Sequence, residues 1–450
     1  MKTITPEDGL VIRESCRLRE GVYLLPRGLT VAASDIVVDG SGVTLVGPSQ
    51  EGVGIAVAGQ TNVTLQNIRI RGYYHGVAAR DVQALRLESC DISSTAEVAP
   101  NTIFLDIWKP AEAAYGGAIL LVHAANTEVR RCSLMHQQNG LLSYHCRRLT
   151  VAENNASYNS GFGFYLYDTC ESLFESNGAD YCCRFEPREG GRHYGHMGAD
   201  AAGFVAVYGS SCNRFRNNAA RMGGDGFFLA GMTPDGMLRG CDDNLFEEND
   251  GSLSPNIAFE ATFCRGNVFR NNFADRCNFG FWLGFSAENV LEGNRMIMNR
   301  QAGIAVENGV GFQVRDNTFQ GNGHGVLLWS RYIETFAKAL PDRLTSADWQ
   351  IEGNTLLRNV KGIRIAANQD HGIRPGPQED DGREELRPRN HRIVRNNIQD
   401  NRVGIELMRT DDTLIEANML HGNVEANLRQ DDARGTTARN NLGSAGAYLL

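Results

Sequence analysis

Residues 266–294 read GNVFRNNFADRCNFGFWLGFSAENVLEGN, and this stretch carries the pattern that decides the fold. An apolar residue is followed three positions later by asparagine, first at Phe269 and Asn272 and again at Leu291 and Asn294. Between the two pairs, a glycine begins a run of alternating apolar residues, which is the period of a β-strand and not of a helix. The stretch therefore holds one short, strand-forming repeat and the start of the next.

The same pattern recurs from Leu65 to Asn441. The asparagines that follow an apolar residue by three positions are Asn177, Asn218, Asn249, Asn272, Asn294, Asn317, Asn354, Asn397 and Asn418. Nearer the N-terminus, the same position of the repeat is occupied by Asn67, Cys90, Cys132 and Asn154. The regular steps between these residues are 21 to 23 positions long. A repeat of this length cannot bury its own apolar face, so neighbouring copies must stack and share one core. Short strands with one turn of chain per repeat predict an all-β solenoid, a parallel β-helix.

Asparagine suits a fixed turn position in such a solenoid. It tolerates left-handed backbone angles, and stacked amides can hydrogen-bond to one another along the axis.

Three units carry a resemblance to a known superfamily. The segments NRFRNNAARMGGDGFFL (213–229), GNVFRNNFADRCNFGFWL (266–283) and FQVRDNTFQGNGHGVLL (312–328) resemble the degenerate repeats of right-handed parallel β-helix proteins of the pectin-lyase-like superfamily. The resemblance implies a single right-handed solenoid. That superfamily includes polysaccharide lyases, glycoside hydrolases, uronan C5-epimerases and non-catalytic proteins, so the resemblance alone does not choose the chemistry.

Composition narrows the partners. The formal net charge of −9 makes nucleic acid an unfavourable partner. The 11 cysteines show no metal-binding spacing, so we expect reduced, core-packed thiols and neither a metal nor another cofactor. The N-terminus MKTITPEDGL has no apolar signal region and no run of 18 apolar residues occurs, so a cytoplasmic protein without a membrane partner is expected, unless a leader has been removed.

Irregular steps in the repeat predict where loops are inserted. We expect an N-terminal cap with the first coils at 1–60, the β-helix with coils of about 22–23 residues at 61–441, and a short tail at 442–450. The insertions are predicted near 93–115, 179–202, 231–243, 330–349 and 368–391. The first two lie just before a glycine-led strand and the other three just after one. Long loops on both flanks of these strands predict a groove.

The floor of this groove is predicted to be aromatic. In each glycine-led strand the second and fourth residues after the glycine should point outward. These positions are Leu142/Tyr144, Tyr165/Tyr167, Val205/Val207, Phe228/Ala230, Ala258/Glu260, Trp282/Gly284, Ala305/Glu307 and Leu327/Trp329. Flat aromatic faces in a groove are surfaces on which sugar rings stack, so Tyr144, Tyr165, Tyr167, Phe228, Trp282 and Trp329 are candidate substrate-binding residues. The alternative is that the flanking loops, or an identical second chain, cover these rings.

Two glutamates are the first candidates for catalysis. Glu260 and Glu307 occupy the same predicted outward register two coils apart, which is roughly 9–10 Å between Cα atoms. Such a separation suits an inverting glycosidase, in which one carboxyl group protonates the leaving oxygen and the other activates water. Asp225 would support them, whereas Asp168 is a candidate at the rim of the groove; each aspartate could instead serve a turn.

The predicted loop RFEPREGGRHYGHMGAD (184–200) supplies a second set of candidates. His193, His196 and Tyr194 could act as base and acid, and Arg184, Arg192 and Asp200, with Tyr144 and His145 nearby, could bind substrate. That set would serve a uronan lyase or C5-epimerase, although the Asp-Pro-His-Asp signature of alginate epimerases is absent. A salt-bridge cluster within the loop is the structural alternative.

Three functions follow. The first is a carbohydrate-active enzyme that cleaves or rearranges glycosidic bonds of an oligo- or polysaccharide by carboxylate acid/base catalysis. The second is a polysaccharide lyase or uronan C5-epimerase that uses histidine, tyrosine and arginine. The third is a non-catalytic solenoid that binds a glycan or a protein, or assembles into a homo-oligomer.

Overall fold

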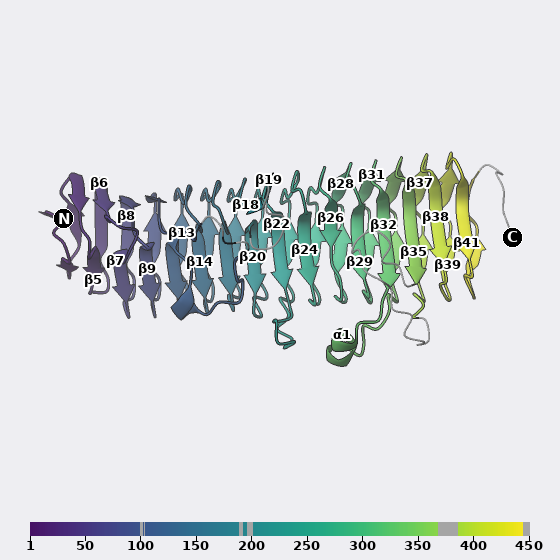
Figure 1. The fold of residues 1–450 in the computed structure, drawn as a ribbon, viewed down its shortest axis with the longest axis horizontal. Coiled ribbons are helices and arrows are strands. Elements are labelled where there is room, and N and C mark those ends of the chain that lie inside the picture. The colour runs from purple at the N-terminus through teal and green to yellow at the C-terminus, as the bar shows by residue number, and fades with distance from the viewer. Residues whose placement is uncertain (100–101, 103, 189–191, 196–200, 368–385, 444–450) are drawn as a thin grey trace. The chain divides into compact units, whose positions relative to one another are not determined.

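A computed structural model describes residues 1–99, 102, 104–188, 192–195, 201–367 and 386–443. The chain divides into two compact units, Met1–Phe228 (unit 1) and Leu229–Leu450 (unit 2). In each unit the chain winds through short parallel strands that stack on their counterparts in the next coil, as Figure 1 shows. Each unit is thus a parallel β-helix, the architecture that the repeat predicts.

In unit 1 the glycine-led strands form the sheet that we call sheet 1. Its strands are β2 (Val11–Ile12), β5 (Leu29–Val31), β7 (Val53–Ala58), β9 (His75–Arg80), β12 (Gly117–Val122), β14 (Leu141–Tyr144), β16 (Phe164–Tyr167) and β20 (Ala202–Val207), and β22 (Asp225–Ala230) runs into unit 2. A second sheet, sheet 2, contains β1 (Lys2–Ile4), β3 (Cys16–Leu18), β4 (Gly21–Leu24), β6 (Val37–Val46), β8 (Thr64–Arg71), β10 (Arg86–Glu88), β11 (Asp91–Ser93), β13 (Glu128–Arg130), β15 (Thr150–Ala152), β17 (Leu173–Glu175) and β21 (Arg214–Arg216).

Unit 2 repeats the arrangement. Its sheet 1 contains β24 (Ile257–Thr262), β26 (Phe279–Trp282), β29 (Ala302–Glu307), β32 (His324–Ser330), β35 (Lys361–Ala367), β38 (Val403–Met408) and β41 (Ala426–Asp431). Its sheet 2 contains β23 (Leu245–Glu247), β25 (Val268–Arg270), β27 (Val290–Glu292), β30 (Gln313–Arg315), β33 (Gln350–Glu352), β36 (Arg392–Val394), β39 (Leu414–Glu416) and β42 (Thr437–Arg439). A third sheet contains β28 (Arg295–Ile297), β31 (Thr318–Gln320), β34 (Thr355–Leu357), β37 (Asn397–Gln399) and β40 (Met419–His421).

The repeated asparagines form a buried ladder along each unit. The ladder of unit 2 is Asn249, Asn272, Asn294, Asn317, Asn354, Asn396, Asn418 and Asn441. Each of these after Asn249 accepts hydrogen bonds from the backbone N–H and the side-chain Nδ2 of the asparagine one coil before it, at 2.8 to 3.1 Å. Amide bonding along the axis is confirmed.

Two details of the ladder prediction were wrong. The left-handed backbone belongs to the residue before each ladder position, such as Asn271 with φ of 55°, and not to the ladder asparagine. The prediction also assigned two asparagines to the ladder that lie one residue before or after it. Asn396, and not Asn397, holds the ladder position. Asn67 has the left-handed φ of 59° that marks the residue before a ladder position, and its side chain bonds to Asp39.

Stacked phenylalanines fill the space between the sheets. Phe164 stacks on Phe204 at 4.8 Å in unit 1, and in unit 2 Phe246 stacks on Phe269 and Phe259 on Phe281, both at 4.9 Å between ring centroids. All are buried. Repetition of the same large residue in one slot lets each coil pack on a copy of itself.

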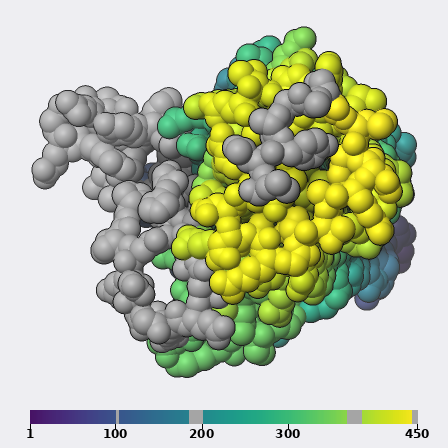
Figure 2. Space-filling view, turned by 90° about the vertical axis from the view of Figure 1, so that its right-hand side faces the viewer, coloured from purple at the N-terminus to yellow at the C-terminus, as the bar shows by residue number. Residues whose placement is uncertain are grey.

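The last coil of unit 2 is more polar than the coils before it. Figure 2 views this end, with the final strands in yellow. Residues of β41 are half-buried or exposed and those of β42 are exposed. Their inward positions hold Gln430 and Ala438, where the preceding coil has Leu407 and Ile415. A solenoid end that meets solvent favours such small or polar residues.

The predicted insertions contain the irregular elements. A one-turn 3-10 helix, η1 (Ala111–Ala113), lies in the first, and β18 (Phe185–Arg188) pairs antiparallel with β19 (Arg192–Gly195) in the second. Met232 and Leu238 bridge across the third. In the fourth, α1 (Glu334–Ala339) places Phe336 against Phe263 and Phe285. Most of the fifth lies outside the described residues. Within the described residues, no helix is both long and apolar enough to cross a membrane.

A buried histidine in unit 2 should make folding stability depend on pH. His391 is fully buried, and burial lowers its pKa to about 3, although the Ser346 backbone acts in the opposite direction. The unfolded chain binds a proton to this histidine at the ordinary pKa of 6.5. The unfolded state therefore gains stability as pH falls from 6.5 to 3, and on the order of 4 kcal/mol of folding free energy is lost over that window.

His391→Phe should flatten this pH dependence, because phenylalanine does not titrate. An aromatic ring fits the position, since the equivalent residue one coil earlier is Trp349, which stacks on Phe312 at 4.2 Å. Urea denaturation at pH 7 and pH 4 measures the change. An equal acid loss in wild type and variant would contradict the assignment.

Candidate functional site

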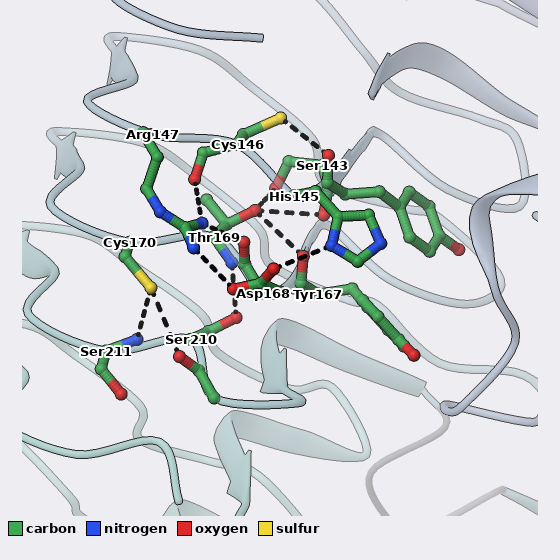
Figure 3. A network of polar contacts seen from close by, with 12 residues as sticks. Ser143, His145, Cys146, Arg147, Tyr167, Asp168, Thr169, Cys170, Ser210 and Ser211 are labelled. Carbon is green, nitrogen blue, oxygen red and sulfur yellow. Dashed lines mark hydrogen bonds and ion pairs between the residues drawn. The ribbon is translucent and has the colours of Figure 1, made fainter. Parts of the chain in front are cut away.

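The candidate site lies in unit 1, where the strands of sheet 1 end. Tyr144 and Tyr167 are the last residues of β14 and β16 and pair directly. The next residues, His145 and Asp168, turn away in the left-handed region with φ of 55° and 45°. This shared turn brings His145 Nδ1 to 2.8 Å from Asp168 Oδ2 (Figure 3). Because an ionised carboxylate only accepts hydrogen bonds, Nδ1 carries a proton, and in the neutral imidazole the lone pair is therefore on Nε2.

Arg147 fixes the carboxylate of this pair. Its Nη2 lies 2.8 Å from Asp168 Oδ1, and its Nη1 donates to the backbone oxygens of Cys146 and Asp168, as Figure 3 shows. Asp168 is thus held from two sides, by His145 and Arg147. The side chains of His145 and Asp168 are 35% and 30% exposed, so the pair is accessible to a substrate.

A second histidine–aspartate pair lies beside the first, at the ends of the two preceding strands of sheet 1. We call the row formed by the two pairs the histidine–aspartate column. His123 Nδ1 lies 3.1 Å from Asp81 Oδ1, and the His123 ring is centred 5.3 Å from the ring of His145. The sequence interpretation did not single out these two residues. The signal was present, because Asp81, His123, His145 and Asp168 each directly follow the last residue of a sheet 1 strand.

Three tyrosines pack beside the pair, but not as an exposed floor. The Tyr144 ring is centred 5.4 Å from the rings of both Tyr165 and Tyr167, and Tyr167 is 5.4 Å from the ring of His145. Only 2%, 1% and 7% of Tyr144, Tyr165 and Tyr167 are exposed, so the prediction of open sugar platforms was wrong for these residues. Burial raises the pKa of Tyr144 and of Tyr165, which keeps both phenols protonated.

The first insertion explains part of this burial. Tyr165 donates from its hydroxyl to the backbone oxygen of Ile107 at 2.8 Å, and Tyr74 donates to that of Ala114 at 2.9 Å. Leu105 is itself buried. The segment that precedes β12 thus packs on the outward side of sheet 1.

The outward aromatics Phe228, Trp282 and Trp329 are buried as well, at 7%, 9% and 1% exposure. In unit 2 the two tryptophan rings meet edge to face at 5.4 Å, within an apolar cluster that includes Ala305 and Leu327. Because the rings pack on each other and on this cluster, they are not the open platforms that the sequence predicts.

The predicted pairing of Glu260 with Glu307 was wrong by two residues. Glu260 pairs with Trp282, which pairs with Ala305, whereas Glu307 pairs with Trp329. The sequence alignment started this strand at Asn256, but Phe259 is the residue that lines up with Phe281 and Ile304.

In that coil Ala258 takes the place of the glycine. Two coil steps and two residues along the strand separate the glutamate Cα atoms by roughly 12 Å. Glu307 is also buried, at 3% exposure.

A family model settles the architecture. The model of the right handed beta helix region matches residues 36–231 and 201–336. The chain belongs to the right-handed β-helix family.

Three solved structures align with nearly the whole chain. The A-module of mannuronan C-5 epimerase AlgE6 from Azotobacter vinelandii is 14% identical over 97% of this chain and 92% of its own, with a TM-score of 0.40. The periplasmic alginate epimerase AlgG is 10% identical over 93% and 79%, with a TM-score of 0.44. The GH136 lacto-N-biosidase of Eubacterium ramulus is 11% identical over 96% and 62%, with a TM-score of 0.36. These likenesses concern the fold alone. No curated relative matches the sequence.

The other candidate residues of this β-helix are placed as follows. Asp225 is fully buried at the start of β22. Arg184 lies near the first insertion, with Nε 3.3 Å from the backbone oxygen of Thr102. Arg192, His193 and Tyr194 lie in β19, whose side chains are not described, and His196 and Asp200 lie outside the described residues. Their catalytic and binding roles stay predictions.

Metal ligation has no candidate in the described part of the chain. There, no three histidine, cysteine, aspartate or glutamate side chains gather closely enough to hold an ion. The two histidines of the site each bond to their own aspartate instead.

Proposed function

We propose that this β-helix acts on an acidic polysaccharide by removing the proton from the sugar carbon that bears the carboxylate. The reaction class is that of a polysaccharide lyase or a uronan C5-epimerase. The observation that carries the proposal is His145, half-exposed and oriented through Nδ1 by Asp168, with a lone pair on Nε2.

His145 is the general base in this proposal. Nε2 takes the substrate proton, and the Asp168 carboxylate stabilises the imidazolium that forms, as in other histidine–carboxylate pairs. Arg147 keeps Asp168 in place through the bond at 2.8 Å. The Tyr167 ring, 5.4 Å from that of His145, brings a phenol next to the base. In the lyase reaction, Tyr167 supplies a proton to the leaving oxygen.

Removal of such a proton needs a cation on the substrate carboxylate, because charge builds up there. Arg80 ends β9 and pairs with Val122, which in turn pairs with Tyr144, so its Cα lies roughly 10 Å from that of Tyr144. The side chain is half-buried, and among the described residues it makes no ion pair. Arg80 is therefore our carboxylate-binding residue.

Carboxylate-pair hydrolysis has weaker support. It needs two carboxyl groups about 6.5–9.5 Å apart across the substrate. Glu260 and Glu307 are offset along their strands, and Glu307 is buried. The histidine pair has the accessible geometry that the glutamates lack.

A substrate panel tests the proposal. Polymannuronate, polyguluronate and polygalacturonate are incubated with the wild type, with Glu260→Gln and with His145→Gln, and unsaturated ends, reducing ends and changes in sugar configuration are read together. We expect unsaturated product or a configuration change with the wild type and with Glu260→Gln, and neither with His145→Gln. Saturated reducing ends that disappear only in Glu260→Gln would overturn the proposal in favour of hydrolysis.

Arg80→Gln should weaken both substrate binding and turnover, because the substrate carboxylate is negative when it binds and gains further charge as the proton leaves. A hydrogen bond to a charged group contributes about 1.5–3 kcal/mol, so kcat/KM should fall roughly 10- to 100-fold. Arg19→Gln, at an exposed position of unit 1 outside the site, is the matched control. An unchanged kcat/KM in Arg80→Gln would remove this residue from the site.

A further inference from the structure

Two cysteines of unit 1 stack on each other in neighbouring coils. Before the cysteines in sequence, Glu88 is the strand partner of Arg130, and directly after them Asp91 and Ser133 form a parallel β-bridge. The Ser133 N–H donates to the backbone oxygen of Cys90 at 2.8 Å. Cys90 and Cys132 therefore occupy the same position one coil apart.

The spacing suits a disulfide. Stacked residues of parallel strands lie about 4.8 Å apart between Cα atoms, inside the range of about 4.4–6.8 Å in which a disulfide closes. Both thiols point into the core: Cys90 Sγ lies 3.7 Å from the backbone oxygen of Leu65, and Cys132 Sγ lies 3.8 Å from that of Leu87. Each cysteine is free and 2% exposed.

We propose that Cys90 and Cys132 are a site of oxidative cross-linking, which hydrogen peroxide or a similarly small peroxide converts into a disulfide between coils. One of the two thiols attacks the peroxide, an S–O bond forms as the O–O bond breaks, and the departing hydroxide takes the thiol proton as water. The second thiol then attacks this sulfenic sulfur. The S–S bond forms, the S–O bond breaks, and a second water leaves with the proton of the second thiol. Two thiols lose two electrons and one peroxide gains them.

The two thiols are in direct contact. A hydrogen bond between their side chains lowers the pKa of Cys90 and raises that of Cys132. The thiolate is the nucleophile, and this contact places the second thiol beside whichever sulfur is oxidised first.

The cross-link would close a loop that contains the first insertion. The segment between Cys90 and Cys132 includes Ile107 and Ala114, whose backbone oxygens bind Tyr165 and Tyr74. Tying the two ends of this segment together restricts the unfolded chain and should raise the thermal midpoint. The inference stands on the thiols alone and does not depend on the proposed reaction.

Peptide mapping tests it. The full chain is treated with hydrogen peroxide, unfolded with an alkylating agent present, digested without reductant and analysed by mass spectrometry. We expect one joined peptide that contains Cys90 and Cys132, and a higher thermal midpoint that reductant reverses.

Cys132→Asn should abolish both effects and still fold, because Asn154 fills the same slot in the next coil. Cys146→Ser, at a buried cysteine that neighbours Thr169, should change neither. Alkylation of both Cys90 and Cys132 after peroxide treatment, or a joined peptide that pairs either one elsewhere, would overturn the proposal.

Discussion

Replacing His145 by glutamine is expected to lower turnover on a polyuronate by about 10²- to 10⁴-fold, the usual contribution of a general base. Glutamine keeps a polar side chain beside Asp168 but has no nitrogen lone pair that accepts a proton. The fold should be unaffected, because His145 stands in a half-exposed turn at the end of β14. The measurement is the initial rate at saturating substrate, together with a circular dichroism spectrum.

Replacing Asp168, the partner of His145, should lower activity by a smaller factor. Asp168→Asn should retain more activity than His145→Gln, since the imidazole remains but loses the carboxylate that fixes its tautomer. His136→Gln is the control. His136 is an exposed histidine of unit 1 stacked on Tyr158. If His136→Gln and His145→Gln lost activity equally, the effect would not belong to the site.

The largest stability effect is expected in the asparagine ladder. Asn294 is 1% exposed; it accepts from the backbone N–H and from Nδ2 of Asn272, and donates to the backbone oxygen of Phe269 and to Oδ1 of Asn317. Asn294→Ala removes all four bonds. Each buried group left unsatisfied costs about 1–3 kcal/mol, so a loss on the order of 3–6 kcal/mol is expected.

Hydrogen exchange localises this effect. The amide of Asn272 should exchange about 100-fold faster in Asn294→Ala for every 3 kcal/mol lost. Asn271→Gly is the control in the same coil, because Asn271 is exposed and its φ of 55° suits glycine. A change below about 1 kcal/mol in Asn294→Ala would mean that the ladder contributes little.

The repeat period was enough to predict the parallel β-helix, because every coil packs on its neighbours in the same way. Phenylalanine in several strands and asparagine after most turns repeat at fixed positions of the coil, and both stack on copies of themselves. Errors arose where two neighbouring residues could fill one slot. Asn396 and Asn397 are both asparagine, and only the hydrogen bond from Asn354 identifies Asn396 as the ladder residue.

The site was predicted less well, for two physical reasons. The register of Glu260 depended on a glycine that is absent from its coil, and Ala258 fills that position instead. The burial of Tyr144 and Tyr165 could not be read from strand alternation. It depends in part on contacts from an insertion distant in sequence, such as the Ile107 backbone oxygen.

Tyr144, His145, Tyr167 and Asp168 were nonetheless named as substrate-binding candidates, and the structure brings them together. The sequence interpretation did not single out Asp81 and His123, which lie in the same row as His145 and Asp168. This row becomes visible only when the residues that directly follow each sheet 1 strand are aligned, because the interpretation compared residues within the strands.

The most direct test of the account is exchange of the sugar C5 proton. A polyuronate is incubated with the protein in deuterium oxide, and the residual C5–H signal is followed by nuclear magnetic resonance alongside the unsaturated product. We predict loss of the C5–H signal, by exchange or by elimination, with the wild type and Glu260→Gln, and its full retention with His145→Gln. Retention of the C5–H signal while the wild type cleaves the polymer to saturated ends would contradict the account.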